Sequence, residues 1–297
     1  MAEEVFSRRI KTLNIDRAFC IRNLKDINCN YIVIGSSRAM NCLNTLRLDS
    51  LTKLRGYNLG YAGSSFSENY LTLHNFLNNN KTKAVLLCAD LFGVINPNVA
   101  YGRGFNASLF LPLIKNDTVF NELYSLENKA KVISWRYLPF VKYAEFNNVY
   151  SIEKLFFRNY SYKDEFFKSK GFMELEKLHS KDMNFLKENN IEDKYFIDLV
   201  SIDYLKKIIS LCKEKKVKLI FFSPPIFSKK FNNIIGKEKL TNILVGLSKS
   251  NDILFLNYNS CEISNDSSLM YDFSHLNKNG AIQFSTLIAD SVIKYLK

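Results

Sequence analysis

The sequence predicts a three-layer α/β/α sandwich built around a five-stranded parallel sheet in flavodoxin-like order. Short apolar, β-branched runs recur along the chain, and segments with helical spacing separate them. One interval between two of these runs is far longer than a crossover between parallel strands requires. We therefore expect a single domain over residues 1–297, with a large insertion or lid at roughly 93–196, after the third strand.

Each strand and helix has its own signal in the sequence. The apolar runs predict strands at residues 31–35, 56–60, 83–89, 217–223 and 252–258. The pair Pro224-Pro225 ends the fourth strand, because proline has no N–H to donate to a sheet. Two segments show a single apolar face at helical spacing, formed by Leu199, Ile202, Leu205, Ile208 and Cys212 and by Ala281, Phe284, Ile288, Val292 and Tyr295.

Composition narrows the class of protein. The 297 residues are 47% hydrophobic, which is enough for a sizeable core, and the net charge is +12. The lysines are spread along the chain, so we infer a generally basic surface and expect no nucleic-acid partner. The N-terminal stretch has acids where a signal peptide has bases, and no run is long enough to span a bilayer.

The six cysteines are widely spaced and form no CxxC pair, which is typical of reduced thiols that pack as small hydrophobic side chains. We expect a cytoplasmic protein with no metal, no cofactor and no integral membrane segment.

The stretch "YIVIGSSRAM", residues 31–40, contains the first predicted strand and the turn after it, so the hydroxyls of Ser36 and Ser37 follow a buried strand. Ligands of open α/β sheets bind beyond the carboxyl ends of the strands. A serine at such a turn is exposed, and its own N–H can help to hold a developing oxyanion. Serine is also a preferred N-cap, so Ser36 and Ser37 by themselves fit either role.

The loop after the fifth predicted strand supplies the groups that a nucleophilic serine needs. "MYDFSHLNKNGAIQFS" places Asp272 and His275 at the same edge of the sheet as Ser37, and Asn277 follows as the expected N-cap of the last helix. A general base must reach the nucleophile, and a carboxylate behind it fixes its tautomer. The other two histidines, His74 and His179, lie in polar, helix-like surroundings. Ser37, His275 and Asp272 are therefore the candidate catalytic residues.

The three stretches "IGSSRAM", "YNLGYAGSSF" and "DFSHLNKNGA" occur in an order that resembles the blocks of the SGNH/GDSL hydrolase superfamily. The resemblance implies that Ser37 is the nucleophile and that the backbone N–H groups of Ser37 and Gly63 form the oxyanion hole. Within the superfamily, the chain looks like the branch found with bacterial surface-polysaccharide genes, in which acyl esters are removed or moved.

One block departs from the family pattern. The third block normally reads Gly-x-Asn-Asp, whereas "LLCADLFGV" offers Asp90 and no asparagine. The missing amide is usually an oxyanion donor, and an ionised Asp90 would repel the oxyanion. Arg38 and Asp90 are candidates for substrate binding, and the alternative is that Arg38 braces the turn by a salt bridge. Asn58 and Gly60 have either a direct role or an internal structural one.

The leading hypothesis is a serine esterase or O-acyltransferase that acts on an acyl, most simply acetyl, ester of a carbohydrate. The alternative is a catalytically inactive glycan-binding protein on the same fold. A nucleotide-binding module is disfavoured, because the sequence has neither a P-loop nor GxGxxG.

The predicted insertion is rich in aromatic residues, which can stack on sugar rings or form the insertion's own core. They include Trp135, Tyr137, Phe140 and Tyr143, and Arg136 and Lys142 lie among them.

Overall fold

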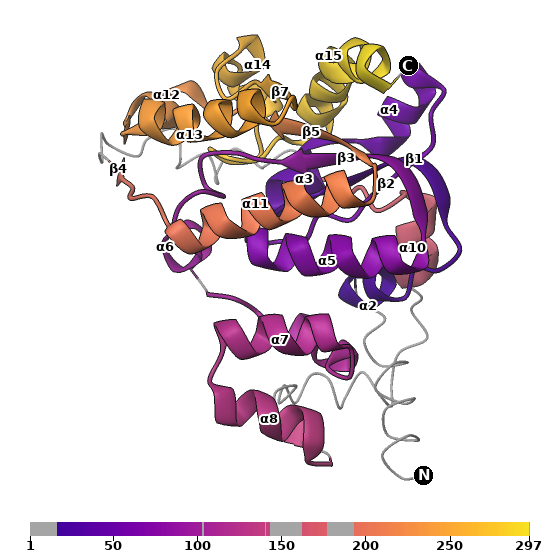
Figure 1. The fold of residues 1–297 in the computed structure, drawn as a ribbon. Coiled ribbons are helices and arrows are strands. Elements are labelled where there is room, and N and C mark those ends of the chain that lie inside the picture. Colours follow the sequence, from indigo (N-terminus) through magenta and orange to yellow (C-terminus); the bar gives the residue numbers. More distant parts are fainter. Residues whose placement is uncertain (1–16, 103, 140, 143–161, 177–192, 297) are drawn as a thin grey trace. The chain divides into compact units, whose positions relative to one another are not determined.

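The computed structural model describes residues 17–102, 104–139, 141–142, 162–176 and 193–296. Five strands form one parallel sheet in the order β2-β1-β3-β5-β7 (Figure 1). They are β1 (Asn28–Ile34), β2 (Gly56–Asn58), β3 (Lys81–Cys88), β5 (Lys218–Ser223) and β7 (Leu254–Asn257). This is the flavodoxin-like order, and each predicted run contains most or all of the corresponding strand. The predicted fold class is confirmed.

The strand register places the predicted site at the point where the strand order reverses. Val33 of β1 is level with Asn58 of β2 on one side and with Leu86 of β3 on the other. All five strands are parallel, so their carboxyl ends lie along one edge. Ligands of such sheets bind at this edge, outside the switch point between the first strand and its neighbours. Ser37 follows β1 after Gly35 and Ser36, so the turn after the strand places it at this edge.

Helices cover both faces of the sheet (Figure 1). Helices α5 (Phe66–Asn79) and α11 (Leu199–Glu214) pack together on one face, and α3 (Ser37–Cys42), α4 (Thr45–Thr52) and α15 (Lys278–Leu296) cover the other. Tyr31 and Val33 point to the second face, where they join a core with Phe284 of α15. Ile32 and Ile34 point to the first face and are equally buried. Burial on both faces explains why the strands read as continuous apolar runs.

Further elements complete the described chain. Beside the main sheet, β4 (Asp193–Lys194) and β6 (Ile234–Ile235) form a two-stranded parallel sheet. The remaining helices are α2 (Arg17–Arg22), α6 (Pro97–Tyr101), α7 (Asp117–Leu126), α8 (Lys129–Tyr137), α10 (Tyr162–Lys168), α12 (Ser228–Asn232), α13 (Lys237–Ser250) and α14 (Glu262–Asn265), with 3-10 turns η1 (Ala107–Leu109), η2 (Leu111–Leu113) and η5 (Ser267–Leu269). No helix in the described part of the chain is both long and apolar enough to cross a bilayer.

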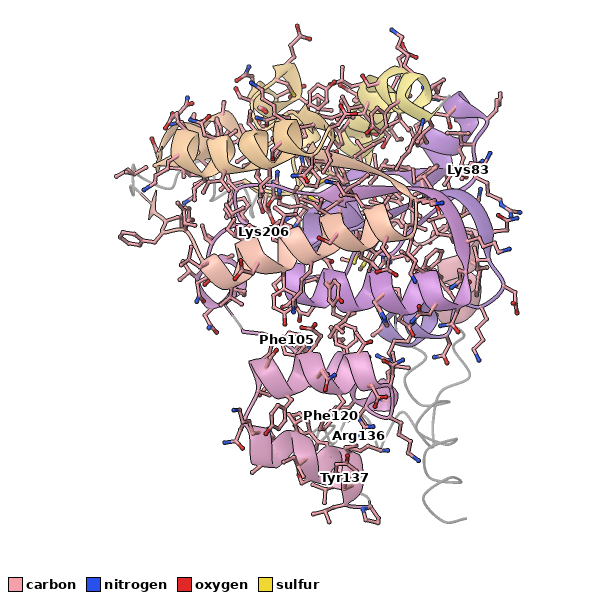
Figure 2. All side chains as sticks on the ribbon, in the orientation of Figure 1. Lys83, Phe105, Phe120, Arg136, Tyr137 and Lys206 are labelled. Atoms are coloured by element: carbon pink, nitrogen blue, oxygen red, sulfur yellow. The ribbon has the colours of Figure 1, made fainter. Side chains whose placement is uncertain are left out.

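The chain divides into two compact units. One comprises residues 1–23 and 105–166, and the other comprises residues 24–104 and 167–297 and holds the main sheet. Within the first unit, the Arg136 guanidinium lies over the Phe120 ring and pairs with Asp117 at 2.6 Å (Figure 2). This pair ties α8 to α7. The interpretation of residues 93–196 as an insertion in a single domain stays a prediction.

One helix face differs from its prediction. Ile202, Leu205, Ile208 and Cys212 of α11 are buried as expected. The prediction for Leu199 was wrong, because its side chain is 75% exposed. Helical spacing assigns a residue to a face, but only a covering element buries it. In the first turn of α11, Ser201 and Ile202 are buried, whereas Leu199 and Val200 stay exposed.

Candidate active site

The turn after β1 presents Ser37 at the carboxyl edge of the sheet. Gly35 has φ = +145°, and a Cβ there would lie 2.5 Å from Cβ of Cys88 on β3, so only glycine fits. Ser36 is the N-cap of α3, and its Oγ accepts a hydrogen bond from the Arg38 N–H at 3.3 Å. Ser37 is the first residue of the helix and is partly exposed. The cap role therefore belongs to Ser36, and the Ser37 hydroxyl points elsewhere.

The loop at residues 270–277 forms a tight turn that holds the other two candidates. The Asp272 carboxylate accepts hydrogen bonds from the backbone N–H groups of Ser274 at 2.7 Å and His275 at 2.9 Å. An antiparallel bridge between Met270 and Leu276 closes the turn. Asn277 caps α15 as predicted, because its Oδ1 accepts from the N–H groups of the helix's first turn.

The three candidates form one hydrogen-bonded relay. Nε2 of His275 lies 2.7 Å from Oγ of Ser37, and Nδ1 of His275 lies 2.8 Å from Oδ2 of Asp272. The side chains of His275 and Asp272 are 21% and 32% exposed, so a ligand can reach them. The structure thus brings Ser37 next to residues more than two hundred positions away in the sequence.

Electrostatics define the direction of this relay. Burial raises the pKa of Asp272, but the hydrogen bond and charge of His275 and the two backbone N–H groups outweigh burial, and the pKa falls below its ordinary value. The ionised carboxylate can only accept, so Nδ1 of His275 carries a proton and donates it. In the neutral imidazole, Nε2 is then the acceptor for the Ser37 hydroxyl. The arrangement can therefore remove a proton from Ser37.

Ser274 is a member of this network that the sequence reasoning missed. Its Oγ lies 3.1 Å from Oδ1 of Asp272 and 3.1 Å from Nδ1 of His275. The sequence did contain a signal for Ser274. An aspartate side chain often accepts a hydrogen bond from the backbone two residues further on, and Ser274 has that position relative to Asp272. Ser274 helps to fix the carboxylate and the imidazole relative to each other.

Arg38 connects four segments beneath the site. Its side chain is almost fully buried, and Nε pairs with Oδ2 of Asp90 at 2.5 Å. Nη1 donates to the carbonyl oxygen of Ser274 at 2.6 Å, and Nη2 donates to that of Pro224 at 2.6 Å. Burial lowers the pKa of Arg38, but the charge of Asp90 outweighs it, and the net pKa is raised. These contacts favour the bracing role over a grip on substrate.

Asp90 is likewise buried and fully engaged. Besides Arg38, it accepts hydrogen bonds from the N–H groups of Phe92 at 3.1 Å and Gly93 at 3.2 Å. The neighbouring Arg38 charge compensates the carboxylate, and the Phe92 ring lies over that guanidinium with 5.5 Å between Cζ and the ring centroid. The repulsion of an oxyanion that an isolated Asp90 would cause is therefore strongly reduced.

The second sequence block is also ordered by internal hydrogen bonds. Nδ2 of Asn58 donates to the carbonyl oxygens of Ala39 at 2.7 Å and Leu43 at 3.0 Å, and Oδ1 accepts from Gly60 N at 2.9 Å. These contacts favour the structural role for Asn58. Gly63 follows in a turn with φ = +67°. Its role as a second oxyanion donor stays a prediction.

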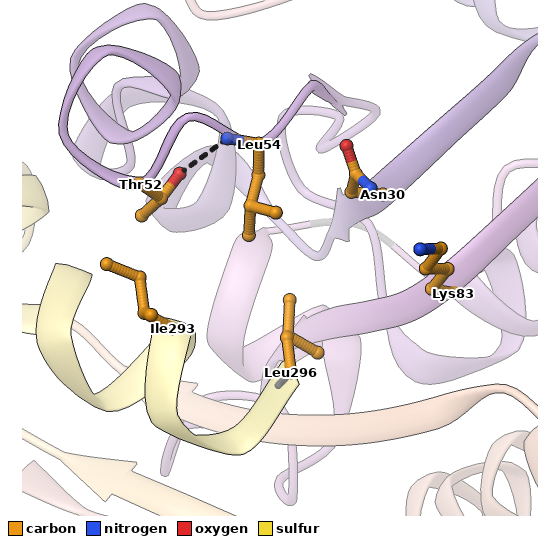
Figure 3. A pocket seen from close by; sticks show the side chains of 6 residues that line it. All are labelled: Asn30, Thr52, Leu54, Lys83, Ile293 and Leu296. Carbon is orange, nitrogen blue, oxygen red and sulfur yellow. Dashed lines mark hydrogen bonds between the residues drawn. The ribbon is translucent and has the colours of Figure 1, made fainter.

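Two pockets lie away from the relay. A cavity of about 70 Å³ is lined by Asn30 and Lys83, which are near the amino ends of β1 and β3, and by Thr52, Leu54, Ile293 and Leu296 (Figure 3). It therefore lies at the opposite edge of the sheet from Ser37. A second pocket of about 340 Å³ lies at the carboxyl end of β7, where Asn257, Asn259 and Lys237 line it. Neither is lined by Ser37, Asp272 or His275.

The aromatic residues for which the sequence allowed either sugar stacking or core packing have different environments. Trp135 is 2% exposed and belongs to the core of its unit, whereas Tyr137 is 66% exposed. Figure 2 labels Tyr137 on α8. Lys142 is buried. Phe140 and Tyr143 lie outside the described residues.

A hydroxyl, an imidazole and a carboxylate that are hydrogen-bonded one after the other are the arrangement of the serine-hydrolase type, here on a flavodoxin-like sheet. Comparison with solved structures finds a protein of Bacteroides fragilis NCTC 9343 assigned as an acylhydrolase, with 13% identity, a TM-score of 0.41, and coverage of 93% of this chain and 94% of that one. It also finds a GDSL-like lipase of Bacteroides thetaiotaomicron VPI-5482, with 13% identity, a TM-score of 0.38, and coverage of 90% and 89%. No protein-family model and no curated protein matches the sequence.

Proposed function

We propose that this protein is a serine esterase or O-acyltransferase of the SGNH/GDSL hydrolase superfamily. The observation that carries the proposal is the relay from Ser37 through His275 to Asp272, with contacts of 2.7 and 2.8 Å. The order of the three sequence blocks supports the same superfamily. An intact relay favours catalysis over the alternative of an inactive glycan-binding protein.

The proposed reaction proceeds through an acyl-serine. Nε2 of His275 takes the hydroxyl proton while Oγ of Ser37 forms a bond to the ester carbonyl carbon. The tetrahedral intermediate collapses, the ester C–O bond breaks, and the imidazolium returns the proton to the departing alkoxide. A water molecule or a sugar hydroxyl then attacks the acyl carbon while Nε2 of His275 takes its proton. The bond between the acyl carbon and Oγ of Ser37 breaks, and the imidazolium returns the proton to Oγ. Asp272 stabilises the imidazolium in both halves and stays ionised throughout.

The proposed oxyanion hole consists of the backbone N–H groups of Ser37 and Gly63. Ser37 is the first residue of α3, where backbone N–H groups have no acceptor within the helix. The pairing of Arg38 with Asp90 supports this assignment, because it compensates the carboxylate that stands in the third block. Arg38 and Asp90 are in this proposal braces of the site.

For the substrate, we propose an acyl ester of a carbohydrate, most simply an acetyl ester, with a place in polysaccharide biosynthesis. The support is the resemblance of the Gly-Ser-Ser-Arg, Tyr-Asn-x-Gly and Asp-x-x-His-Leu-Asn stretches to the branch that acts on bacterial surface polysaccharides. Hydrolysis and transfer differ only in which acceptor reaches the acyl-serine. A cytoplasmic location stays a prediction from the composition.

A fluorophosphonate probe tests the proposed class directly. We expect stoichiometric labelling of the native protein, with peptide mapping that places the label on Ser37, and no label on the Ser37→Ala variant. The Ser36→Ala variant is the matched control and should still be labelled. Labelling of another residue, or of none in a folded protein, would contradict the proposal.

A further inference from the structure

An unusually exposed apolar surface lies on the unit that holds the sheet. The four most exposed large hydrophobic side chains among the described residues of that unit are Val99, Phe196, Leu199 and Val200, at 62%, 73%, 75% and 52%. We call these four residues the apolar rim. Single exposed hydrophobic residues are ordinary, but a contiguous group on a soluble surface marks a site of interaction.

Backbone contacts hold the members of the rim together. Ile95 and Ile197 form an antiparallel bridge, and the N–H of Asp198 donates to the carbonyl oxygen of Val94 at 2.9 Å. Val99 lies one turn beyond this bridge on α6. Phe196, Leu199 and Val200 flank it on the other chain segment. The rim is therefore one surface formed by two segments.

Contacts between side chains link the rim to the candidate active site. The Phe92 ring lies 6.2 Å from the Tyr195 ring, edge to face, and it also lies over the Arg38 guanidinium. Arg38 is the neighbour of Ser37 in the chain. A continuous set of contacts thus leads from the nucleophile position through Phe92 to the residue before Phe196.

A cationic segment is connected to the rim through the two-stranded sheet. Helix α12 carries Lys229 and Lys230 and no acidic residue. It leads directly into β6, which pairs in parallel with β4, and β4 leads directly into the segment of Phe196. Figure 1 shows α6, β4 and α12 at the same end of the unit. Nζ of Lys230 lies 5.2 Å from the ring centroid of Phe273, in the loop of the relay.

We propose that the apolar rim and α12 form a docking surface for an anionic lipid bilayer, beside the candidate active site. Apolar side chains flanked by lysines are the combination that binds such surfaces, since the side chains enter the acyl boundary and the lysines attract the headgroups. The net charge of +12 favours the same partner. The inference extends the proposed function, because the ester would then be presented at a membrane surface.

Vesicle flotation tests docking without any turnover. The full-length Ser37→Ala protein is mixed with vesicles of phosphatidylcholine, alone or with phosphatidylglycerol, at about 0.1 M and about 0.5 M salt. We expect flotation with the anionic vesicles that weakens with salt, and little flotation with phosphatidylcholine alone. The double change Phe196→Ser with Leu199→Ser should lower vesicle affinity at least about tenfold. Lys229→Ser should weaken binding mainly at low salt.

The controls are exposed hydrophobic residues elsewhere. Leu46→Ser on α4 and Leu287→Ser on α15 change side chains that are also exposed and should leave flotation unaltered. Absence of flotation, or equal losses in these controls, would overturn the proposal. So would a loss confined to Tyr137→Ser in the other unit, or a marked fall in melting temperature of the rim variant, which would show that the rim packs against the chain itself.

A soluble acetyl ester separates this inference from the proposed function. The rim variant made in the parent protein should hydrolyse that ester at the parent rate, because the relay is untouched. If the parent protein hydrolyses no ester, the proposed function fails. The flotation experiment still tests the docking surface, because it does not depend on activity.

Discussion

Ser36 and Ser37 are adjacent and chemically identical, but the turn after β1 gives them different roles. The Ser36 side chain accepts a hydrogen bond from the Arg38 N–H, whereas the Ser37 hydroxyl lies 2.7 Å from Nε2 of His275. A backbone that makes one residue the cap must make the next the first residue of the helix. The two serines are therefore a matched pair for testing the site.

We expect Ser37→Ala to lower the rate of acetyl-ester hydrolysis by about 10⁴-fold or more, because the nucleophile is lost. Ser36→Ala should retain activity within about twofold and lose about 1 kcal/mol of stability, since it removes a helix cap. Initial rates with a chromogenic acetate, together with urea unfolding, measure both effects. The reverse pattern would mean that Ser36 is the nucleophile.

Asp272→Asn should lower turnover by about 10⁴-fold, because an amide can stabilise the wrong tautomer of His275 and cannot compensate the imidazolium. Ser274→Ala is the matched change in the same loop and should cost far less, since the ionised carboxylate remains. An Asp272→Asn variant within about twofold of the parent rate would show that Ser37 and His275 suffice.

The lowered pKa of Asp272 also predicts how stability depends on pH. Its pKa in the folded protein lies below the ordinary value of about 3.9, so the unfolded chain binds the proton more tightly. Stability from this group is therefore fully present above about pH 4 and is lost as the pH falls through the folded pKa. The difference in unfolding free energy between the parent and Asp272→Asn should shrink on acidification. A difference that stays constant from about pH 7 to about pH 3 would contradict this assignment.

At the scale of elements, the Arg38 side chain holds together segments that the chain order keeps apart. It joins α3 to Asp90 in the turn after β3, to the end of β5 and to the loop before α15. These are the strand ends that carry the relay. The geometry of Ser37 and His275 thus depends on a buried ion pair that touches neither hydroxyl nor imidazole.

We expect Arg38→Met to lower the free energy of unfolding by about 3–5 kcal/mol, because it leaves the Asp90 charge buried without its partner. Adding Asp90→Asn should recover part of this loss, since the charge is removed while an oxygen still accepts from Phe92 and Gly93. A double-mutant cycle by urea unfolding measures the coupling. Losses that simply add would show that the two charges act independently.

In the whole molecule, the candidate functional residues are divided between the two units. The relay and the apolar rim belong to the unit that holds the sheet, whereas Trp135 and Tyr137 belong to the other. The aromatic residues therefore need a test that separates recognition from packing. Their very different burial provides it.

Trp135→Ala should destabilise the protein by about 3–5 kcal/mol and affect all substrates equally, because it empties a core position. If the insertion recognises glycan, Tyr137→Ala should slow cleavage of an acylated oligosaccharide selectively and spare a small chromogenic ester. Ile133→Ala, another exposed change on α8, is the control. Equal effects of Tyr137→Ala on both substrates, or none, would exclude a glycan role for this residue.

The amino-acid pattern alone was enough to predict the five strands of the sheet and the three residues of the relay. Local periodicity identified the strands, and Ser37, Asp272 and His275 could be placed at one edge because all parallel strands end there. The N-cap role of Asn277 followed from local chemistry as well. These features depend on residues near in sequence or on a rule of topology.

The contacts of Arg38 and the exposure of particular helix faces could not be predicted from the sequence and follow from the folded chain. Two partners of Arg38 are the backbone carbonyls of Pro224 and Ser274. Every residue has a backbone carbonyl, so the residue type does not show which carbonyl accepts a hydrogen bond. Leu199 has the spacing of a buried residue, yet its exposure depends on the elements that pack around α11. Spacing is set by the helix itself, whereas burial and long-range hydrogen bonds are set by segments distant in the chain.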